Sequence, residues 1–366
     1  MVRRLTKAET AVFKPGSDRL DPALTAEQAN LQYVNDRNEG IQRTKAGTHF
    51  QYTWRSSKIT SGKTLLRIKK LAIPPAWTEV WICPNDNGHL QATGFDVLGR
   101  KQYRYHTLWN EARNETKFHK LIEFGKALPQ LRKKISDDLS HSGLTKEKVQ
   151  ATIVSLMERT FIRIGNHEYE KLYGSYGLTT LKDGHVDIKG PVMKFQFKGK
   201  KGVHHDITLK NKRLAKIVKA CRDIPGKELF QYFNDNGDRC TVDSGMVNSY
   251  IQEALGGVFS AKDFRTWAGT LCILSSFREM PDPEDAASLK KNVIAAVDEV
   301  SVRLGNTRSV CKKYYVHPKV IALYEDGGLR KYLNQMEGDP QPDDITAQLT
   351  SDEKVLMKIL QKLQHA

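Results

Sequence analysis

Cysteine is scarce in this sequence, and its positions are scattered. The 366 residues include five cysteines, and none of them forms a CxxC spacing. This pattern fits neither a disulfide framework nor a zinc site, and it is typical of reduced thiols in a cytosolic compartment. The sequence also has no apolar run near the roughly 18 residues of a membrane span and no N-terminal signal pattern. We therefore expect a soluble, cytoplasmic protein without a membrane partner.

Signatures of nucleotide and metal binding are also missing. Ser61-Gly-Lys-Thr64 resembles the end of a phosphate-binding P-loop, but Ser57 stands where the first glycine of that motif belongs. We therefore expect no nucleotide site. No cluster of carboxylates suggests a bound divalent ion, so the sequence predicts neither a metal site nor a cofactor.

Acidic residues are outnumbered by basic ones. The chain has 58 Lys and Arg against 42 Asp and Glu, which gives a net charge of +16. Residues 336–366 carry six acids and three lysines, a net charge of −3 that leaves +19 for residues 1–335. An excess of this size favours a polyanionic partner, nucleic acid above all, over an inert basic surface.

Composition and periodicity predict an α+β fold class. Residues 1–48 are polar and are expected to form a poorly ordered arm with a short helix at Thr25–Val34. Residues 49–112 alternate in the manner of strands and turns, which predicts a small antiparallel β-rich domain. Residues 113–335 predict a larger, mainly α-helical domain that contains a β-hairpin. Residues 336–366 predict an acidic linker and a C-terminal helix at Leu349–Leu363.

One stretch, residues 304–318, combines groups suited to phosphodiester chemistry. It places Asn306, a hydrogen-bonding side chain, nine positions before Tyr315, with Lys312 and Lys313 between them. A phenol has a pKa near 10 and is a weak nucleophile at neutral pH. Nearby cations favour its ionised form and also neutralise the phosphate that it would attack.

A helix through this stretch would separate the two groups. Nine residues of unbroken helix rise roughly 13 Å and leave Asn306 and Tyr315 on opposite faces. If both serve one phosphate, a loop or bend is expected within residues 307–313. The alternative is that Tyr314 and Tyr315 are packing aromatics beside a solvated lysine pair.

Residues 99–106 form a second informative stretch. In a strand, Tyr103 and Tyr105 share one face, and Arg100 and Lys101 flank them. Such a face can reach both the base edges and the backbone of a duplex. The alternative is that the tyrosines belong to a core and the basic residues face solvent.

A long amphipathic helix is predicted over Thr145–Tyr173. Arg159 and Arg163 would then share one face. Arg163 lies between two isoleucines, so we expect it to be partly buried and to need an anion, which is an internal carboxylate or a substrate phosphate.

Alternating apolar residues over Val192–Leu209 predict a hairpin whose tip is Gly199-Lys-Lys-Gly202. Lys200 is placed to swing into a groove, unless the tip is only a solvated turn. His204 and His205 point to opposite faces of the returning strand, which makes them poor joint metal ligands.

Two helices are expected near the phosphodiester stretch. One helix follows Ala261–Trp267, a segment in which Arg265 stands beside aromatic residues. The other starts with Asp282 as its N-cap and runs to Leu304, where Gly305 ends it.

Seven short motifs follow one another within residues 50–335, namely Ala72-Ile-Pro-Pro-Ala-Trp77, Gly88-His-Leu-Gln-Ala-Thr-Gly94, Gly99-Arg-Lys-Gln-Tyr-Arg-Tyr105, Arg163-Ile-Gly-Asn166, Phe197-Lys-Gly-Lys200, Phe264-Arg-Thr266 and Leu304-Gly-Asn-Thr307 with Tyr315-Val-His-Pro318. In this order they resemble the type IB DNA topoisomerases, in particular their compact bacterial and poxvirus-like branch. The resemblance implies relaxation of supercoiled double-stranded DNA without ATP or metal, by a monomer that wraps the duplex in the nucleoid.

The resemblance also implies roles for five side chains. Tyr315 would attack a DNA phosphate and form a 3′-phosphotyrosyl link, with Tyr314 as the rival nucleophile. Arg163 and Arg265 would hold the non-bridging oxygens. Lys200 would protonate the leaving 5′ oxygen. Asn306 would donate a further hydrogen bond at a position where many relatives have histidine. Unlike histidine, an asparagine side chain does not ionise, so it would not transfer a proton.

Contacts to DNA are expected from the residues of both domains, namely Arg100, Gln102, Tyr103, Tyr105, Lys201 and Lys312. Two other functions remain open at this point. A site-specific tyrosine recombinase uses the same five-part constellation, although a helical arm would be expected in place of the N-terminal sheet. A non-catalytic basic DNA-binding protein would show the charge without the chemistry.

Overall fold

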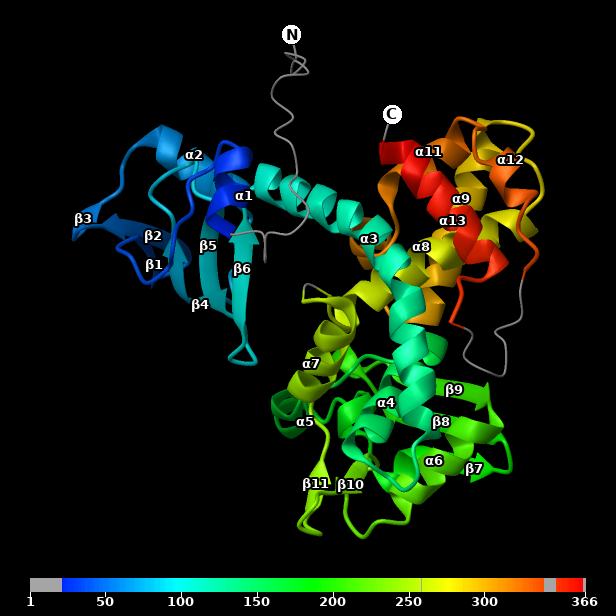
Figure 1. Ribbon diagram of the computed structural model, residues 1–366. Helices are drawn as coiled ribbons and strands as arrows, with labels where there is room; N and C mark the ends of the chain where they lie inside the picture. Colours follow the sequence, from blue (N-terminus) through cyan, green and yellow to red (C-terminus); the bar gives the residue numbers. More distant parts are fainter. Residues whose placement is uncertain (1–21, 258, 339–346, 365–366) are drawn as a thin grey trace. The chain divides into compact units, whose positions relative to one another are not determined.

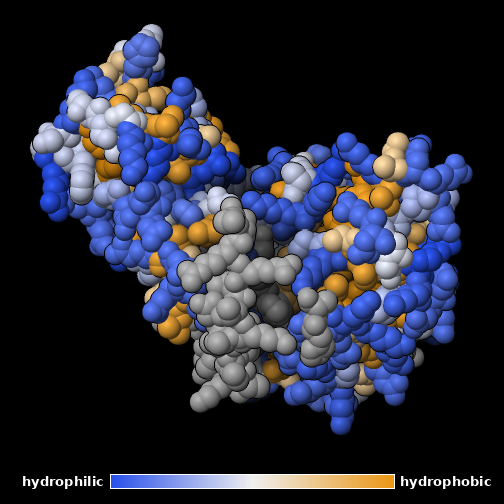
Figure 2. All heavy atoms as spheres, turned by 90° about the horizontal axis from the view of Figure 1, so that it is seen from above, coloured by the Kyte–Doolittle hydropathy of each residue, from blue (hydrophilic) through white to orange (hydrophobic). Residues whose placement is uncertain are grey.

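The computed structural model describes residues 22–257, 259–338 and 347–364. The chain divides into two compact units, Met1–Lys117 and Phe118–Ala366 (Figure 1). The boundary falls inside helix α3 (Thr107–Ser140), which contains Pro129. Each unit has a core of its own. Hydrophilic residues cover most of the face that Figure 2 shows.

The first unit contains an antiparallel sheet of six strands in the order β3-β2-β1-β4-β5-β6. This confirms the expected β-rich N-terminal part. Its elements are α1 (Pro22–Gln28), β1 (Ile41–Ala46), β2 (His49–Trp54), β3 (Ser57–Lys58), α2 (Gly62–Lys70), β4 (Thr78–Ile82), β5 (Leu90–Phe95) and β6 (Lys101–Tyr105). The strand β6 lies at one edge of the sheet, so one side of its backbone is not paired within the sheet.

The prediction of an irregular arm over residues 1–48 is wrong for its last part. Strand β1 lies inside the sheet and pairs with both β2 and β4. Ile41 is buried in the core of this unit, whereas most of the other side chains of β1 are polar and only partly covered. Residues 41–46 therefore form a strand because they pair with strands on both sides, and their side-chain pattern alone does not predict it. Residues 1–21 lie outside the described part of the chain.

The predicted helix at Thr25–Val34 is shorter and starts earlier. The helix α1 begins at Pro22, a residue suited to a first turn, and ends at Gln28. Asn30 has a left-handed φ of 54°, which breaks the helical path before Val34.

The second unit is mainly helical, as predicted, and contains two small sheets. Its helices after α3 are α4 (Lys146–Thr160), α5 (His167–Tyr173), α6 (Lys212–Arg222), α7 (Ser244–Leu255), α8 (Ala261–Glu279), α9 (Ala286–Leu304), α10 (Arg308–Tyr314), α11 (Pro318–Glu325), α12 (Arg330–Leu333) and α13 (Ser351–Gln364). Its strands are β7 (Val186–Lys189), β8 (Val192–Lys198), β9 (His204–Lys210), β10 (Gln231–Phe233) and β11 (Arg239–Thr241).

The predicted hairpin is the β8–β9 pair, and β7 extends it to a three-stranded sheet. Met193, Phe195 and Phe197 point to one side of β8 and are buried, as the alternation predicted. Burial of this face fixes the register of the hairpin, since a shift by one residue would expose all three side chains. The tip that carries Lys200 is thereby held at a defined place.

The C-terminal helix α13 docks on the second unit. Its apolar face buries Val355, Leu356 and Ile359. Glu353 is also buried, where it accepts hydrogen bonds from Arg132 and from Trp267 Nε1. Most of the predicted linker that precedes this helix, residues 339–346, is outside the described chain.

Within the described ranges, no helix is both long enough and apolar enough to cross a membrane.

Candidate active site

The helix predicted over Thr145–Tyr173 is broken, and the break places Arg163. Helix α4 ends at Thr160 because Phe161 adopts a left-handed conformation with φ 57°. The following segment stays non-helical until Asn166, whose side-chain oxygen accepts from the backbone N–H of Glu168 at 2.8 Å and caps α5. Arg163 therefore does not share a helical face with Arg159. It lies on an irregular connection between two helices.

Gly165 explains why this connection can turn so sharply. Its φ of +102° is a conformation that L side chains rarely adopt. Gly177 packs directly against it, and a Cβ at Gly177 would lie 2.6 Å from the Gly165 Cα. Backbone N–H groups of Leu178 and Thr179 donate to the carbonyls of Arg163 and Ile164 at 2.8 and 2.7 Å. The backbone at Arg163 is thus held rigidly.

The acceptors of Arg163 are uncharged. Its Nη2 donates to Asn306 Oδ1 at 2.7 Å and to the Gly305 carbonyl at 3.1 Å. Loss of hydration and the neighbouring charge of Arg265 lower the pKa of Arg163 to about 10. The guanidinium stays charged at neutral pH, and its surroundings favour an incoming anion. Of the two anions that the sequence left open, these contacts favour a substrate phosphate over an internal carboxylate.

Arg265 lies within helix α8, because that helix begins at Ala261 and not after Trp267 as predicted. Its side chain is buried, and its two Nη atoms donate to the carbonyls of Phe161 at 2.6 Å and Leu304 at 2.7 Å. Both carbonyls belong to helix ends, where no intrahelical donor satisfies them. The helix ends therefore orient the guanidinium of Arg265.

Asn306 follows helix α9 after a single capping residue, Gly305. The N-cap of α9 is Asp285 and not the predicted Asp282, since Asp285 Oδ1 accepts from the Ser288 N–H at 2.7 Å. The predicted end is confirmed: the helix stops at Leu304 and Gly305 forms a left-handed C-cap with φ 56°. This turn directs the side chain of Asn306 toward Arg163.

The bend predicted within residues 307–313 lies mostly earlier. Gly305 and Asn306 change the chain direction, Thr307 is the N-cap of the next helix, and residues 308–314 are helical in α10. A single glycine in the left-handed region is enough for the reversal, so the longer loop is not needed. The break nevertheless brings both ends of the stretch to one site, because Asn306 contacts Arg163 and Tyr315 lies beside Arg265.

Tyr315 comes directly after α10 and lies beside Arg265. The Cζ of Arg265 is 5.0 Å from the centre of the Tyr315 ring. The Tyr315 carbonyl accepts from Thr270 Oγ1 at 3.3 Å, and a Cβ at Gly269 would lie 2.6 Å from that carbonyl oxygen. Helix α8 therefore holds both the arginine and the backbone of the tyrosine.

Tyr314 has a different environment. It is 38% exposed, and the Nζ of Lys313 lies 5.3 Å from its ring centre. Tyr315 is half-buried and lies next to Arg265. This contrast favours Tyr315 over Tyr314 as the nucleophile.

Lys200 lies at the tip of the β8–β9 hairpin, where Lys201 adopts a left-handed φ of 61°. The Nζ of Lys200 is 6.0 Å from the Tyr169 ring centre. Loss of hydration, and then the positive charge of Arg163, lower the pKa of Lys200 below its usual range, and Tyr315 opposes this shift. Direct contacts thus join Arg163 with Asn306 and Arg265 with Tyr315, and Lys200 lies close enough to this group to be affected by the charges of Arg163 and Tyr315.

Two of the predicted DNA contacts form an exposed aromatic pair on β6. Tyr103 and Tyr105 have ring centres 5.9 Å apart and planes within 9°. They are 47% and 38% exposed, so they do not belong to the core. Burial of its remaining surface raises the pKa of Tyr105.

The other predicted contacts of this unit are engaged internally. The Nη2 of Arg100 lies 2.7 Å from Asp96 Oδ2, and Gln102 Nε2 donates to the same oxygen at 3.0 Å. Asp96 therefore orients both side chains. In the second unit, Lys201 and Lys312 are exposed.

Sequence reasoning missed the backbone carbonyls of Phe161, Leu304 and Gly305, which accept from the two arginines. It also considered His205 only as a metal ligand. The related signal in the sequence is the pair of glycines at positions 199 and 305, because the structure places the His205 ring where a side chain at either position would lie.

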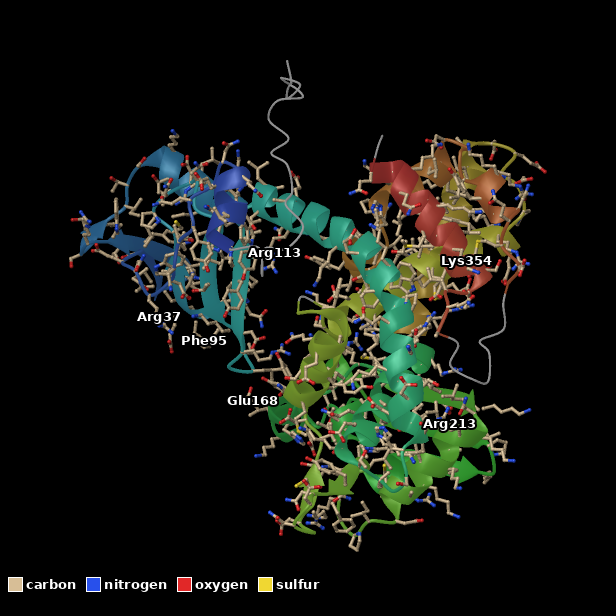
Figure 3. All side chains as sticks on the ribbon, viewed as in Figure 1. Arg37, Phe95, Arg113, Glu168, Arg213 and Lys354 are labelled. Carbon is tan, nitrogen blue, oxygen red and sulfur yellow. The ribbon has the colours of Figure 1, made fainter. Side chains whose placement is uncertain are left out.

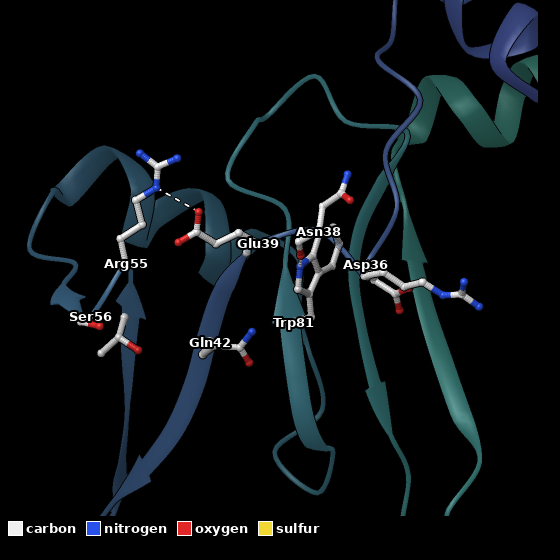
Figure 4. A pocket seen from close by; sticks show the side chains of 10 residues that line it. Asp36, Asn38, Glu39, Gln42, Arg55, Ser56 and Trp81 are labelled. Carbon is white, nitrogen blue, oxygen red and sulfur yellow. Dashed lines mark hydrogen bonds and ion pairs between the residues drawn. The ribbon is translucent and has the colours of Figure 1, made fainter.

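A polar hollow of about 480 Å³ lies in the first unit (Figure 4). Its lining includes Asp36, Asn38 and Trp81, together with Arg55, whose Nε donates to Glu39 at 3.0 Å. It contains none of the five side chains described above. Across the described ranges, no group of three or more His, Cys, Asp and Glu side chains is arranged to hold a metal ion.

Two protein-family models match the chain. The catalytic core of eukaryotic DNA topoisomerase I matches residues 106–337, and the N-terminal domain of bacterial DNA topoisomerase IB matches residues 49–96. The first match covers the part of the second unit that holds the five side chains and ends before helix α13. The second covers four of the six strands of the sheet in the first unit.

Individual relatives agree with these matches. DNA topoisomerase 1B of Acanthamoeba polyphaga mimivirus is 34% identical over 79% of this chain and 88% of its own length. DNA topoisomerase 1B of Vaccinia virus (strain Copenhagen) is 26% identical over 64% of this chain and 72% of its own. DNA topoisomerase 1 of Schizosaccharomyces pombe is 27% identical over 60% of this chain and 27% of its own.

A solved complex of the XerH site-specific recombinase aligns with a TM-score of 0.33 and 15% identity, over 55% of this chain and 51% of that chain. This likeness is too weak to support the recombinase alternative. The family matches span both described units, and the relatives in viruses and yeast are named DNA topoisomerase 1B or DNA topoisomerase 1. The chain belongs to the type IB DNA topoisomerases.

Proposed function

We propose that the chain relaxes supercoiled double-stranded DNA by breaking and resealing one strand through a covalent bond to Tyr315. The phenol loses its proton to water, and its oxygen attacks a backbone phosphorus. The bond from phosphorus to the 5′ oxygen breaks, and Lys200 gives that oxygen a proton. A 3′-phosphotyrosyl link and a free 5′-hydroxyl result. After strand rotation, the 5′-hydroxyl attacks the phosphotyrosine and restores the DNA.

The observation that carries this proposal is a pair of arginines beside Tyr315 whose hydrogen-bond acceptors are neutral. Arg163 donates to an amide and a carbonyl, and Arg265 donates to two carbonyls. Each guanidinium therefore keeps its full charge for a partner. Phosphoryl transfer needs such fixed positive charge around the non-bridging oxygens, and the loss of one such donor typically costs about 10²–10³ in rate.

Asn306 and Lys200 complete the arrangement. The Oδ1 of Asn306 accepts from Arg163, and its Nδ2 donates one hydrogen to the Leu304 carbonyl at 3.4 Å, so the second hydrogen of Nδ2 is the one proposed to meet a phosphate oxygen. This assignment supports a hydrogen-bonding role without proton transfer. The lowered pKa of Lys200 makes its ammonium group a better proton donor than an ordinary lysine.

The proposed partner is duplex DNA, bound by a monomer without a nucleotide, in the nucleoid of a bacterial cytoplasm. The phosphotyrosyl link keeps the energy of the broken bond, so resealing needs no ATP. Tyr103 and Tyr105 offer an exposed aromatic pair, and Lys201 and Lys312 offer exposed charge. Arg100 and Gln102, which Asp96 orients, would add polar contacts beside them.

Plasmid relaxation in excess chelator and without ATP tests this proposal. We expect the wild-type protein to relax any supercoiled plasmid and to leave a covalent protein–DNA adduct after a denaturant quench. The Tyr315→Phe protein should bind DNA but form no adduct, because it lacks the attacking oxygen. Tyr314→Phe is the matched control and should keep the adduct.

Each alternative has a distinct outcome in the same assay. An adduct from Tyr315→Phe that is absent from Tyr314→Phe would move the nucleophile to Tyr314. Relaxation that requires a paired target site would point to a recombinase. Salt-sensitive binding without any adduct would leave only a DNA-binding protein.

A further inference from the structure

His205 lies on strand β9 with its ring against the core of the hairpin. It is the direct cross-strand partner of Phe197, and the two rings stack with centres 4.9 Å apart and planes within 20°. Phe197 is buried and also faces His185, whose ring packs edge-on against Tyr176 at 4.4 Å. The His205 ring is therefore the outer end of a rigid aromatic row.

Two glycines give space to this ring from opposite segments. A Cβ built on Gly199 would lie 2.6 Å from the Cδ2 and Nε2 atoms of His205. A Cβ built on Gly305 would lie 2.5 Å from its Cε1. Real Cβ atoms do not approach other atoms this closely, so both positions depend on glycine while the ring is there. The ring thus touches the hairpin tip and the C-cap of α9 at the same time.

These two contact points precede two residues of the proposed chemistry. Gly199 is followed by Lys200, and Gly305 is followed by Asn306. The Gly305 carbonyl also accepts from Arg163 at 3.1 Å. Apart from the Gly305 contact, the Arg163, Arg265 and Asn306 group is held by its own hydrogen bonds to helix ends. Lys200 lies on an exposed tip, and the His205 ring packs against the residue directly before it.

We propose that His205 is a positioning residue, which sets the distance from Lys200 to the phosphate-binding group of Arg163, Arg265 and Asn306. This inference rests on the proposed role of Lys200 as the proton donor to the leaving oxygen. His205 itself does not contact the reacting atoms. It acts as a rigid spacer between the backbone of the hairpin tip and the backbone of Gly305.

The electrostatic environment of the ring agrees with a spacer. Burial, followed by the charges of Arg163 and Arg265, lowers the pKa of His205 to about 4. The imidazole is therefore neutral at neutral pH, and it adds no positive charge beside the two arginines. A lysine or arginine of similar reach would repel them. A neutral flat ring fills the space between the two glycines without this cost.

The test compares two leaving groups in single-turnover cleavage. One duplex carries the normal 5′ oxygen at the cleavage site, and the other carries sulfur at the same bridging position. A thiolate leaves without a proton because a thiol has a pKa near 8.5, far below that of an alcohol. A defect in proton donation therefore appears with oxygen and disappears with sulfur.

We expect His205→Ala to cleave the oxygen substrate about 100-fold more slowly than wild type, since a small misplacement of a reacting group has effects of this size. Its affinity for DNA should be unchanged. On the sulfur substrate it should approach the wild-type rate. His204→Ala is the matched control, because His204 is the exposed neighbour on the opposite face of β9, and it should behave like wild type with both substrates.

A double variant gives an independent check. In a Lys200→Ala background, adding His205→Ala should cause little further loss on the oxygen substrate, because both changes remove the same step. Equal slowing of His205→Ala with oxygen and sulfur would overturn the inference, and so would wild-type rates with both. An additive double variant would also count against it.

Failure of the proposed function has a separate signature. If wild type forms no covalent adduct, the nucleophilic mechanism itself is wrong. If sulfur does not restore the rate of Lys200→Ala, Lys200 is not the proton donor. Neither result depends on the behaviour of His205→Ala.

Discussion

At the scale of single residues, the site depends on where charge is left uncompensated. Arg132 in the same unit shows the opposite case, because it lies within 2.7 Å of carboxylate oxygens of Glu158 and Glu353. Carboxylates raise the pKa of Arg132 despite its burial, whereas burial and Arg265 lower that of Arg163. The fold thus gives Arg132 two carboxylates as partners, whereas it gives Arg163 only a carbonyl and an amide oxygen. The one with neutral partners is the one suited to bind a phosphate.

The protonation of Lys200 predicts how the rate of DNA cleavage depends on pH. Its protonated form is the proposed acid, and loss of hydration together with Arg163 lowers its pKa below 10.5. Activity should therefore be present at lower pH and be lost as pH rises through this lowered pKa. We expect the second-order rate constant for cleavage of the oxygen substrate to fall with a midpoint below 10.5, because that constant reports groups of the free enzyme.

The sulfur substrate is the control for this profile, since its cleavage should show no such fall. A midpoint at or above 10.5, or the same fall with both leaving groups, would contradict the assignment of Lys200.

At the scale of elements, helix ends place the chemistry. The carbonyls of Phe161 and Leu304 both accept from Arg265, so the ends of α4 and α9 meet at one guanidinium. Helix α8 supplies that guanidinium and also contacts the backbone of Tyr315 through Gly269 and Thr270. Helix ends leave acceptors unsatisfied, which makes them suitable holders for an arginine.

Helix α13 extends this support, and its buried Glu353 makes a prediction for stability. Glu353 accepts from Arg132 and from Trp267 Nε1 on α8. Removing one partner of a buried ion pair typically costs about 3–5 kcal/mol. We expect Glu353→Ala to lower the free energy of unfolding of the second unit by about 3 kcal/mol, measured by denaturant unfolding. Lys354→Ala, at the exposed neighbouring position labelled in Figure 3, should change it little.

The same carboxylate gives the sign of the pH effect on stability. Burial opposes ionisation, but the hydrogen bonds and charge of Arg132 dominate and lower the pKa of Glu353 below 4.5. Its stabilising contribution is therefore present above 4.5 and is lost as pH falls through the lowered pKa. The difference between wild type and Glu353→Ala should shrink below pH 4.5. A difference that stays constant there would contradict the ion pair.

At the scale of the whole molecule, charge governs encounter with DNA. Residues 1–335 carry a net charge of +19 and residues 336–366 contribute −3, which gives +16 for the chain. Hydrophilic side chains cover most of the face in Figure 2. Binding through phosphate contacts releases counterions, so affinity falls steeply with salt.

We expect the dissociation constant for a short duplex to rise about 10³-fold or more between roughly 50 and 200 mM salt, as for a protein that makes about six phosphate contacts. Fluorescence anisotropy with the Tyr315→Phe protein measures binding without cleavage. Lys312→Ala and Lys201→Ala should each reduce the slope of log affinity against log salt by about 1. A slope that stays unchanged in both would remove these lysines from the interface.

Local chemistry was readable from the sequence alone. Strand alternation gave the hairpin and its buried face, a glycine after Leu304 marked the end of α9, and the motifs around Arg163, Lys200, Arg265, Asn306 and Tyr315 marked the site. These features depend on neighbours along the chain, for which periodicity and turn chemistry are sufficient.

Tertiary structure alone decided the rest, because it depends on partners that are distant in the sequence. Pairing with β2 and β4 placed β1 in the sheet, although its residues look irregular. The left-handed turn at Phe161 is held by a contact to Arg265, more than a hundred residues away, and it breaks a pattern that reads as one helix. Whether Arg163 met a carboxylate or neutral oxygens was likewise settled only when Gly305 and Asn306 came beside it.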